Sequence, residues 1–175
     1  MTSVDLCPRI YVASLADYNN GNLHGIWIDL DENTDVDEVF EKINKMLSES
    51  KYPVAEEFAI HDYDDFGGME INENESIENV VEMANYLTKH GEAFALWSNN
   101  VGFEGAKDNF EEAYVGHYDS KKQYAEQFAD DIYSAKDLGE LAIYIDWEKY
   151  ADDLFSNDYC DIEGNRSGIY VFRNI

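Results

Sequence analysis

The chain has 175 residues, with 38 Asp and Glu against 12 Lys and Arg, so its net charge at pH 7 is −26. Hydrophobic residues make up 45% and aromatic residues 14% of the sequence, which excludes a disordered acidic chain. Nucleic acid backbones and anionic membranes carry the same sign of charge, so direct binding to either is excluded as the main activity. We expect partners with basic surfaces, or cations.

The first part of the chain predicts a small ββαβ unit. Residues 9–14 and 25–30 are rich in β-branched and aromatic side chains, and we expect two strands joined by a longish loop. Apolar residues at helical spacing between residues 36 and 47 predict an amphipathic helix. Residues 57–63 predict the third strand, which completes the unit.

The remainder of the chain predicts mainly helices until close to its end. Ser76 is a candidate N-cap for the first of these helices, and Gly91 is its expected end. Three further amphipathic helices are predicted at residues 106–114, 120–133 and 146–155. A β-hairpin built on residues 159–163 and 169–173 closes the chain.

We therefore predict an α+β fold, arranged as an elongated chain of three small modules. Residues 1–65 form the N-terminal ββαβ module, residues 66–103 a central helical module, and residues 104–175 a C-terminal module of helices and a β-hairpin. Because small modules have thin cores, this arrangement favours support from a partner subunit.

The acidic residues are clustered and not interspersed with bases. Ten acids and no Lys or Arg lie between Lys51 and Lys89, and nine acids lie between Lys136 and Arg166 with the single base Lys149. An ordinary soluble surface mixes both signs of charge.

The net charge is comparable to that of a stretch of DNA of the protein's own size. Duplex DNA carries one charge per ~1.7 Å, so 26 net charges correspond to about 44 Å of DNA. A compact chain of this length is about 40 Å across. Composition thus indicates DNA mimicry, with a halophilic or merely soluble acidic protein as the alternative.

One segment resembles a calcium-binding EF-hand loop. Asp62, Asp64, Gly67 and Glu73 occupy positions 1, 3, 6 and 12 of that pattern. Position 5, which needs an oxygen ligand, is Phe66, and the segment that enters the loop predicts a strand where an EF-hand has a helix. The pattern therefore disfavours a metal site.

No motif indicates a catalytic centre. The four histidines lack metal-binding spacing, and GxSxG, Walker and GxGxxG motifs do not occur. Cys7 and Cys160 have no CxxC spacing and predict neither a disulfide framework nor a zinc site. We expect no enzymatic activity, no metal and no cofactor.

The sequence predicts a cytoplasmic protein. No window approaches the ~20 apolar residues of a membrane-spanning helix, and no signal-peptide pattern occurs.

Four segments of the sequence resemble the ArdA antirestriction proteins. They are residues 8–30, 56–64, 110–118 and 143–155, and the last covers the antirestriction motif of the family. Their order along essentially the whole chain is much more specific than any single segment.

The resemblance implies a protein that binds and inhibits type I restriction-modification enzymes. It implies a homodimer, joined through its C-terminal module, whose carboxylates imitate the phosphates of bent B-form DNA and block the groove of the methyltransferase and specificity subunits. Carriage on mobile genetic elements is also implied. An acidic chaperone or inhibitor of another basic DNA-binding protein shares these electrostatics, and a polysaccharide-modifying or calcium-dependent enzyme is a further alternative.

The candidate residues fall into two groups. Acids on predicted exposed faces are candidates for a DNA-mimic surface: Asp29, Asp31, Asp35, Asp37, Glu38, Glu41, Glu70, Glu73, Glu75, Glu78, Glu82, Glu111, Glu112, Glu126, Asp130 and Asp131. The resemblance assigns a second group to the antirestriction motif and dimer interface: Tyr144, Asp146, Trp147, Tyr150, Asp152, Asp153 and Leu154. Asp152 makes this motif more acidic than in many relatives.

Overall fold

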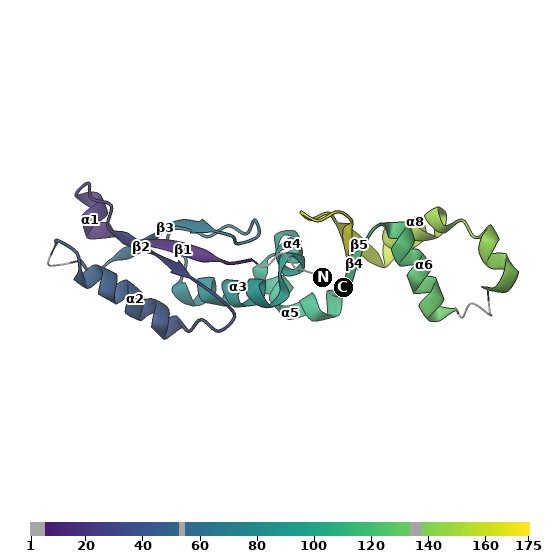
Figure 1. Ribbon diagram of the computed structural model, residues 1–175, viewed down its shortest axis with the longest axis horizontal. Helices are drawn as coiled ribbons and strands as arrows, with labels where there is room; N and C mark the ends of the chain where they lie inside the picture. The colour runs from purple at the N-terminus through teal and green to yellow at the C-terminus, as the bar shows by residue number, and fades with distance from the viewer. Residues whose placement is uncertain (1–5, 53–54, 134–137) are drawn as a thin grey trace. The chain divides into compact units, whose positions relative to one another are not determined.

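A computed structural model describes residues 6–52, 55–133 and 138–175 and shows a mixed α+β protein (Figure 1). The α+β class predicted from the sequence is confirmed. By its internal contacts the chain divides into two compact units, Met1–Lys107 (unit 1) and Asp108–Ile175 (unit 2). In the described residues each unit contains a three-stranded antiparallel sheet. The finer division into three modules stays a prediction.

The sheet of unit 1 has the strand order β2-β1-β3. Strands β1 (Arg9–Ser14), β2 (Gly25–Asp29) and β3 (Phe58–Asp64) lie where the sequence predicts them. β1 is central and pairs antiparallel with both neighbours, and a β-bulge interrupts its pairing with β3. The expected loop between β1 and β2 begins with a short helix, α1 (Leu15–Asn19).

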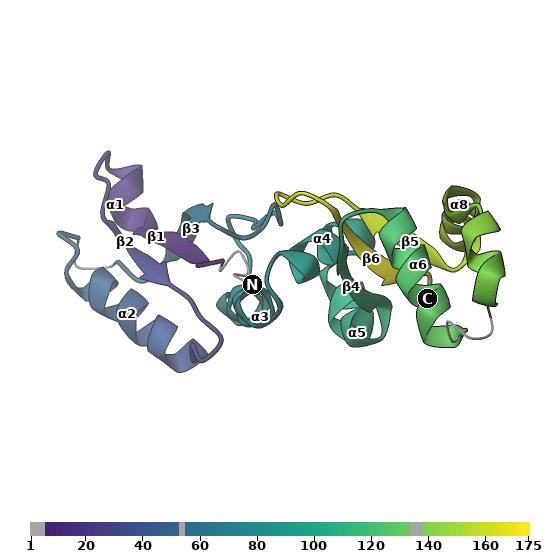
Figure 2. The same cartoon turned by 45° about the vertical axis from the view of Figure 1, so that its right-hand side comes forward.

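Two amphipathic helices cover one side of this sheet (Figures 1 and 2). Helix α2 (Val36–Ser48) begins after the N-cap Asp35, and α3 (Ile77–His90) lies between the predicted N-cap Ser76 and Gly91. Both N-cap side chains accept a backbone N–H, which satisfies a donor that the helix itself cannot pair. The buried core of unit 1 includes Ile10, Val12, Ile28, Val39, Ile43, Val80 and Leu87.

Two further helices follow α3. Helix α4 (Glu92–Val101) contributes the buried Phe94 and Trp97 to the core. Gly102 then adopts φ +84, a left-handed conformation that suits glycine, and α5 (Phe103–Ala113) begins directly after it. The boundary between the two units falls within α5.

The sheet of unit 2 corrects one prediction. The predicted C-terminal hairpin is confirmed as β5 (Tyr159–Ile162) and β6 (Ile169–Arg173). The expectation of helices until close to the end is wrong at β4 (Tyr114–Tyr118), which pairs with β6 and gives the order β4-β6-β5. This strand follows α5 without a break, so no turn signal separates strand from helix in the sequence.

Two helices of unit 2, α6 (Lys121–Ile132) and α8 (Trp147–Asn157), pack against each other and against its sheet. The 3-10 helix η1 (Gly139–Tyr144) precedes α8 and buries none of its residues. Tyr124 and Ala125 of α6 and Ala151 and Leu154 of α8 form one buried cluster with residues of β5 and β6. None of the helices in the described ranges is long and apolar enough to cross a membrane.

Candidate functional site

The acids predicted for the DNA-mimic surface all lie at the surface of their unit. Most of their side chains are exposed, and Glu75, Glu82 and Glu126 are half-buried. Six of the exposed acids come from one stretch of unit 1, from the end of β2 through the first turns of α2: Asp29, Asp31, Asp35, Asp37, Glu38 and Glu41. Amphipathic spacing explains this result, since the apolar side of α2 faces the sheet and its acidic side faces water.

Several of these acids also organise the local backbone. Asp35 Oδ1 accepts the N–H of Asp37 at 2.8 Å, and Asp31 Oδ1 accepts the N–H of Asn33 at 2.8 Å. Glu75 Oε1 accepts a hydrogen bond of 3.0 Å from the amide of Asn79. These bonds hold the carboxylates in place while leaving their charge at the surface.

Glu82 is a predicted acid whose charge a nearby base partly neutralises. Lys107 Nζ lies 3.3 Å from Glu82 Oε2 and 3.0 Å from Glu104 Oε2. The hydrogen bonds to Glu104 and Glu82 raise the pKa of Lys107, so this lysine stays charged beside them. Glu82 consequently contributes less to a negative surface than the exposed acids of α2 do.

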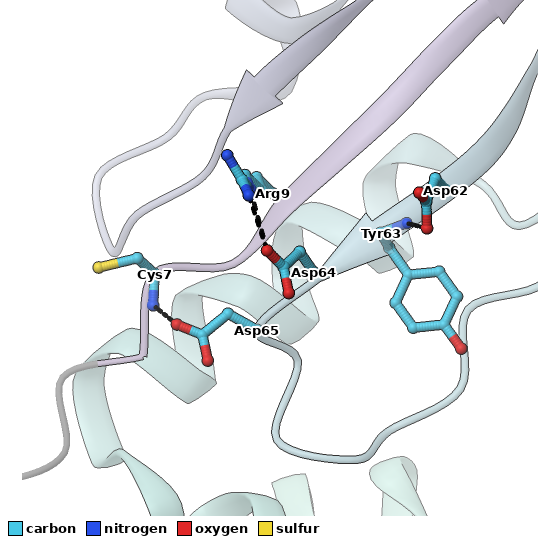
Figure 3. Close-up of polar contacts among 6 residues, drawn as sticks. All are labelled: Cys7, Arg9, Asp62, Tyr63, Asp64 and Asp65. Atoms are coloured by element: carbon cyan, nitrogen blue, oxygen red, sulfur yellow. Dashed lines mark hydrogen bonds and ion pairs between the residues drawn. The ribbon is translucent and has the colours of Figure 1, made fainter.

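A hollow of about 600 Å³ opens at one end of the sheet of unit 1. Four carboxylates line it, of which Asp29 and Asp31 were predicted for the mimic surface and Asp64 and Asp65 were not. Arg9 also lines it and donates to Asp64 at 2.8 Å, and Asp65 accepts the backbone N–H of Cys7 at 2.6 Å (Figure 3). The three acids at residues 62, 64 and 65 are the sequence signal that could have found this group.

The EF-hand-like segment is built as part of the core and not as an ion-binding loop. Phe66 is 2% exposed and packs edge-on against Tyr63, with ring centroids 5.9 Å apart. The carboxylate of Asp62 accepts the N–H of Tyr63, and Asp64 pairs with Arg9 (Figure 3). In the described part of the chain no three His, Cys, Asp or Glu side chains gather in a way that holds a metal ion.

Some residues of the antirestriction motif stabilise the fold of unit 2, and others are exposed at its surface. Asp146 caps α8 by accepting the N–H of Lys149 at 3.1 Å, and Leu154 is buried in the core. The rings of Trp147 and Tyr150 lie 6.2 Å apart. The remaining three, Tyr144, Asp152 and Asp153, are exposed.

Large apolar side chains are exposed next to this motif in unit 2. They lie at the end of α6 and on η1: Ile132, Tyr133, Leu141, Ile143 and Tyr144. Ile143 and Tyr144 are each 79% exposed, which is high for side chains of this size. Large apolar side chains exposed to this degree are a feature of surfaces that bind another protein.

Asp17 is a buried carboxylate that the sequence patterns did not indicate. It is 1% exposed, and its Oδ2 accepts a hydrogen bond of 2.5 Å from Ser50 Oγ. This hydrogen bond lowers the pKa of Asp17, although burial alone would raise it. Asp17 therefore remains charged inside unit 1 and holds α1 to the segment after α2.

Together these features define an acidic α+β protein whose carboxylates are concentrated on its surface. The sequence matches the family described as Antirestriction protein (ArdA) over residues 10–165. The chain therefore belongs to the ArdA antirestriction family, as the sequence segments indicated. Membership implies an inhibitor that acts on restriction enzymes, in a family not known for enzymatic activity. A search of curated proteins finds no match.

Proposed function

We propose that this protein inhibits type I restriction-modification enzymes by occupying their DNA-binding groove as a DNA mimic. The observation that carries the proposal is the surface position of every predicted mimic acid, in a chain with a net charge of −26. The family match supports restriction enzymes as the general class of target. In this mechanism the exposed carboxylates take the places of phosphates opposite Lys and Arg of the methyltransferase and specificity subunits.

The electrostatics of DNA binding account for how such a mimic would compete. A groove that binds duplex DNA gains affinity by releasing the counterions of the phosphates. Dense carboxylates also collect counterions and attract a basic groove over long range, which raises the association rate at low salt. No metal, cofactor or catalytic step is needed, and the protein would act in the cytoplasm, where incoming DNA meets restriction enzymes.

The proposal includes a homodimer joined through the C-terminal module of a three-module chain. The exposed apolar side chains at the end of α6 and on η1 support this part, and Tyr144 connects them to the antirestriction motif. A second copy would remove this apolar surface from water, which stabilises association by roughly 25 cal/mol per Å² before the cost of lost freedom.

The test is competition with a DNA duplex for a purified type I methyltransferase complex, at low and at high salt. We expect the protein to displace the duplex at low salt and to lose most of this capacity as salt rises. Absence of displacement at low salt would refute the proposal. It would favour the alternative, an acidic chaperone or inhibitor of another basic DNA-binding protein.

A further inference from the structure

The side of the unit 1 sheet that faces away from α2 and α3 carries an aromatic pair bordered by carboxylates. In the strand register Tyr11 lies opposite Trp27, and Arg9 lies opposite both Asp29 and Asp64. Residues directly opposite each other on paired strands point to the same face. Helices α2 and α3 lie on the other side of the sheet (Figures 1 and 2). Trp27, Asp29 and Asp64 are exposed to solvent on this face, which we call the open face.

Arg9 shows that this face binds a guanidinium group. Its guanidinium carbon lies 4.8 Å from the centroid of the Trp27 ring, and its Nη2 lies 2.8 Å from Asp64 Oδ2. The hydrogen bond to Asp64 raises the pKa of Arg9, and the charges of Asp29 and Asp62 act in the same direction. The face thus provides both an aromatic ring for stacking and carboxylates for pairing, as arginine recognition requires.

The face keeps negative charge beyond what Arg9 neutralises. Asp64 pairs with the Arg9 guanidinium, and the charges of Asp29 and Asp62 act on the same group. The Arg9 and Asp64 side chains are 46% and 58% exposed, and Trp27 is 43% exposed. Since exposed ion pairs are weak, the side chain of Arg9 can give way to another cation at little cost.

We propose that this open face, made of Trp27, Asp29, Asp62 and Asp64, receives an arginine side chain of the target enzyme in the place that Arg9 occupies in the isolated chain. The proposal rests on the DNA-mimic function and adds a contact that carboxylates alone do not give. The occupant follows from charge complementarity, because the groove that binds DNA is lined with Arg and Lys and this face is acidic and aromatic. Arg9 then competes with the arginine of the target enzyme for the same place on the open face.

The first experiment compares Trp27→Leu with the unchanged protein in the competition assay. Leucine keeps an apolar side chain but removes the indole ring, so we expect about 3- to 30-fold weaker binding to the methyltransferase complex. The slope of log affinity against log salt should not change, because no charge is lost. Leu23→Ala is the matched control, since Leu23 is 73% exposed and precedes β2 at the opposite end from Asp29. Equal affinities of Trp27→Leu and the unchanged protein would overturn the proposal.

The second experiment tests the role of Arg9 as a competitor. Arg9→Gln and Lys42→Gln each make the chain more negative by one charge, but Lys42 is exposed on α2 and not on the open face. We expect Arg9→Gln to bind several-fold more tightly than Lys42→Gln. Equal or weaker binding would contradict the exchange of Arg9 for an arginine of the target.

These experiments separate this inference from the proposed function. If the unchanged protein does not displace DNA, the proposed function fails, and this inference fails with it. If the unchanged protein competes but the Trp27 and Arg9 variants match their controls, this inference alone fails. A change in sedimentation caused by Trp27→Leu would instead assign the face to contact between copies of this chain and would also overturn it. Circular dichroism and thermal unfolding of each variant verify that it folds.

Discussion

Asp17 differs from the surface carboxylates because hydrogen bonds inside unit 1 hold its charge. Its pKa lies below the usual value of 3.8, chiefly because Ser50 donates a hydrogen bond to it. A carboxylate with a lowered pKa in the folded state stabilises the fold fully above its unfolded pKa. That stabilisation is lost as the pH falls through the lowered pKa.

We therefore predict that Ser50→Ala destabilises unit 1 more at about pH 7 than at about pH 2.5. Urea unfolding of the variant and the unchanged protein at the two pH values measures the difference. Ser50 Oγ also accepts the N–H of Tyr52, but the loss of this bond has the same effect at both pH values. Ser48→Ala is the control, because Ser48 donates to the carbonyl of Lys45 and not to a carboxylate. A Ser50→Ala effect that is the same at both pH values would contradict the role assigned to Asp17.

Position 67 requires glycine for two reasons, its left-handed backbone conformation and the close approach of a neighbouring side chain. Its φ is +62, and a Cβ atom added there would collide with the Cβ atom of Ala95. We predict that Gly67→Ala destabilises the protein by about 2 to 4 kcal/mol, as the sum of left-handed strain and overpacking. Gly21→Ala isolates the strain, since Gly21 has φ +78 and open space around it, and should cost only about 1 to 2 kcal/mol. Equal losses of stability in urea unfolding would show that the contact with Ala95 is unimportant.

Secondary structure could be predicted wherever local chemistry decides it. Ser76 was predicted as an N-cap because a serine precedes an amphipathic pattern, and its hydroxyl accepts the N–H of Asn79 as expected. Strand β4 was missed because the segment from Tyr114 to Tyr118 is short and includes Gly116, where a bulge shifts the register with β6. Its partner strand lies some 50 residues further along the chain, and no local pattern reveals such a pairing.

The candidate acidic surface was predictable only where local spacing along the chain decides which side chains are exposed. Helical spacing placed Asp37, Glu38 and Glu41 on the exposed side of α2, and they are exposed. The grouping of Asp29 with Asp64 depends on the pairing of β2 and β3 with β1, which the sequence patterns do not specify. The exposed acids were therefore accessible from sequence, but their neighbours across the sheet were not.

The exposed apolar side chains of η1 lead to a prediction at the scale of this element. Because Ile143 and Tyr144 are each 79% exposed, they contribute little to the core of unit 2. We predict that Ile143→Ser combined with Tyr144→Ser weakens dimerisation at least about 10-fold while changing the free energy of unfolding of the protomer by about 0.5 kcal/mol or less. Sedimentation velocity over a range of concentrations measures the first effect.

The matched control is Leu23→Ser, which removes an exposed apolar side chain from unit 1. It should leave dimerisation unchanged. If the η1 double variant sediments as the unchanged protein does, η1 does not form the dimer interface, and the exposed side chains need another partner.

At the scale of the whole molecule, the net charge of −26 acts on folding and on binding in opposite directions. Like charges repel one another in the compact state, and the repulsion decreases as salt screens them. The screening length falls from roughly 30 Å at about 0.01 M salt to roughly 3 Å at about 1 M. Attraction between the acidic surface and a basic groove decreases over the same range.

We predict that raising NaCl from about 0.01 M to about 1 M increases the melting temperature of the isolated protein by several degrees while it abolishes competition with DNA. Differential scanning calorimetry and the competition assay measure the two effects in the same buffers. The double variant Glu38→Gln with Glu41→Gln, on the exposed side of α2, is the control, because it has two fewer repelling charges. Its melting temperature should respond less to salt.

The opposite result would contradict the prediction. A melting temperature of the unchanged protein that falls as salt rises would mean that attractive ion pairs, such as Lys107 with Glu82 and Glu104, outweigh repulsion between the acids. In that case the acidic surface would not cost the fold stability, and the net charge would need no compensating function.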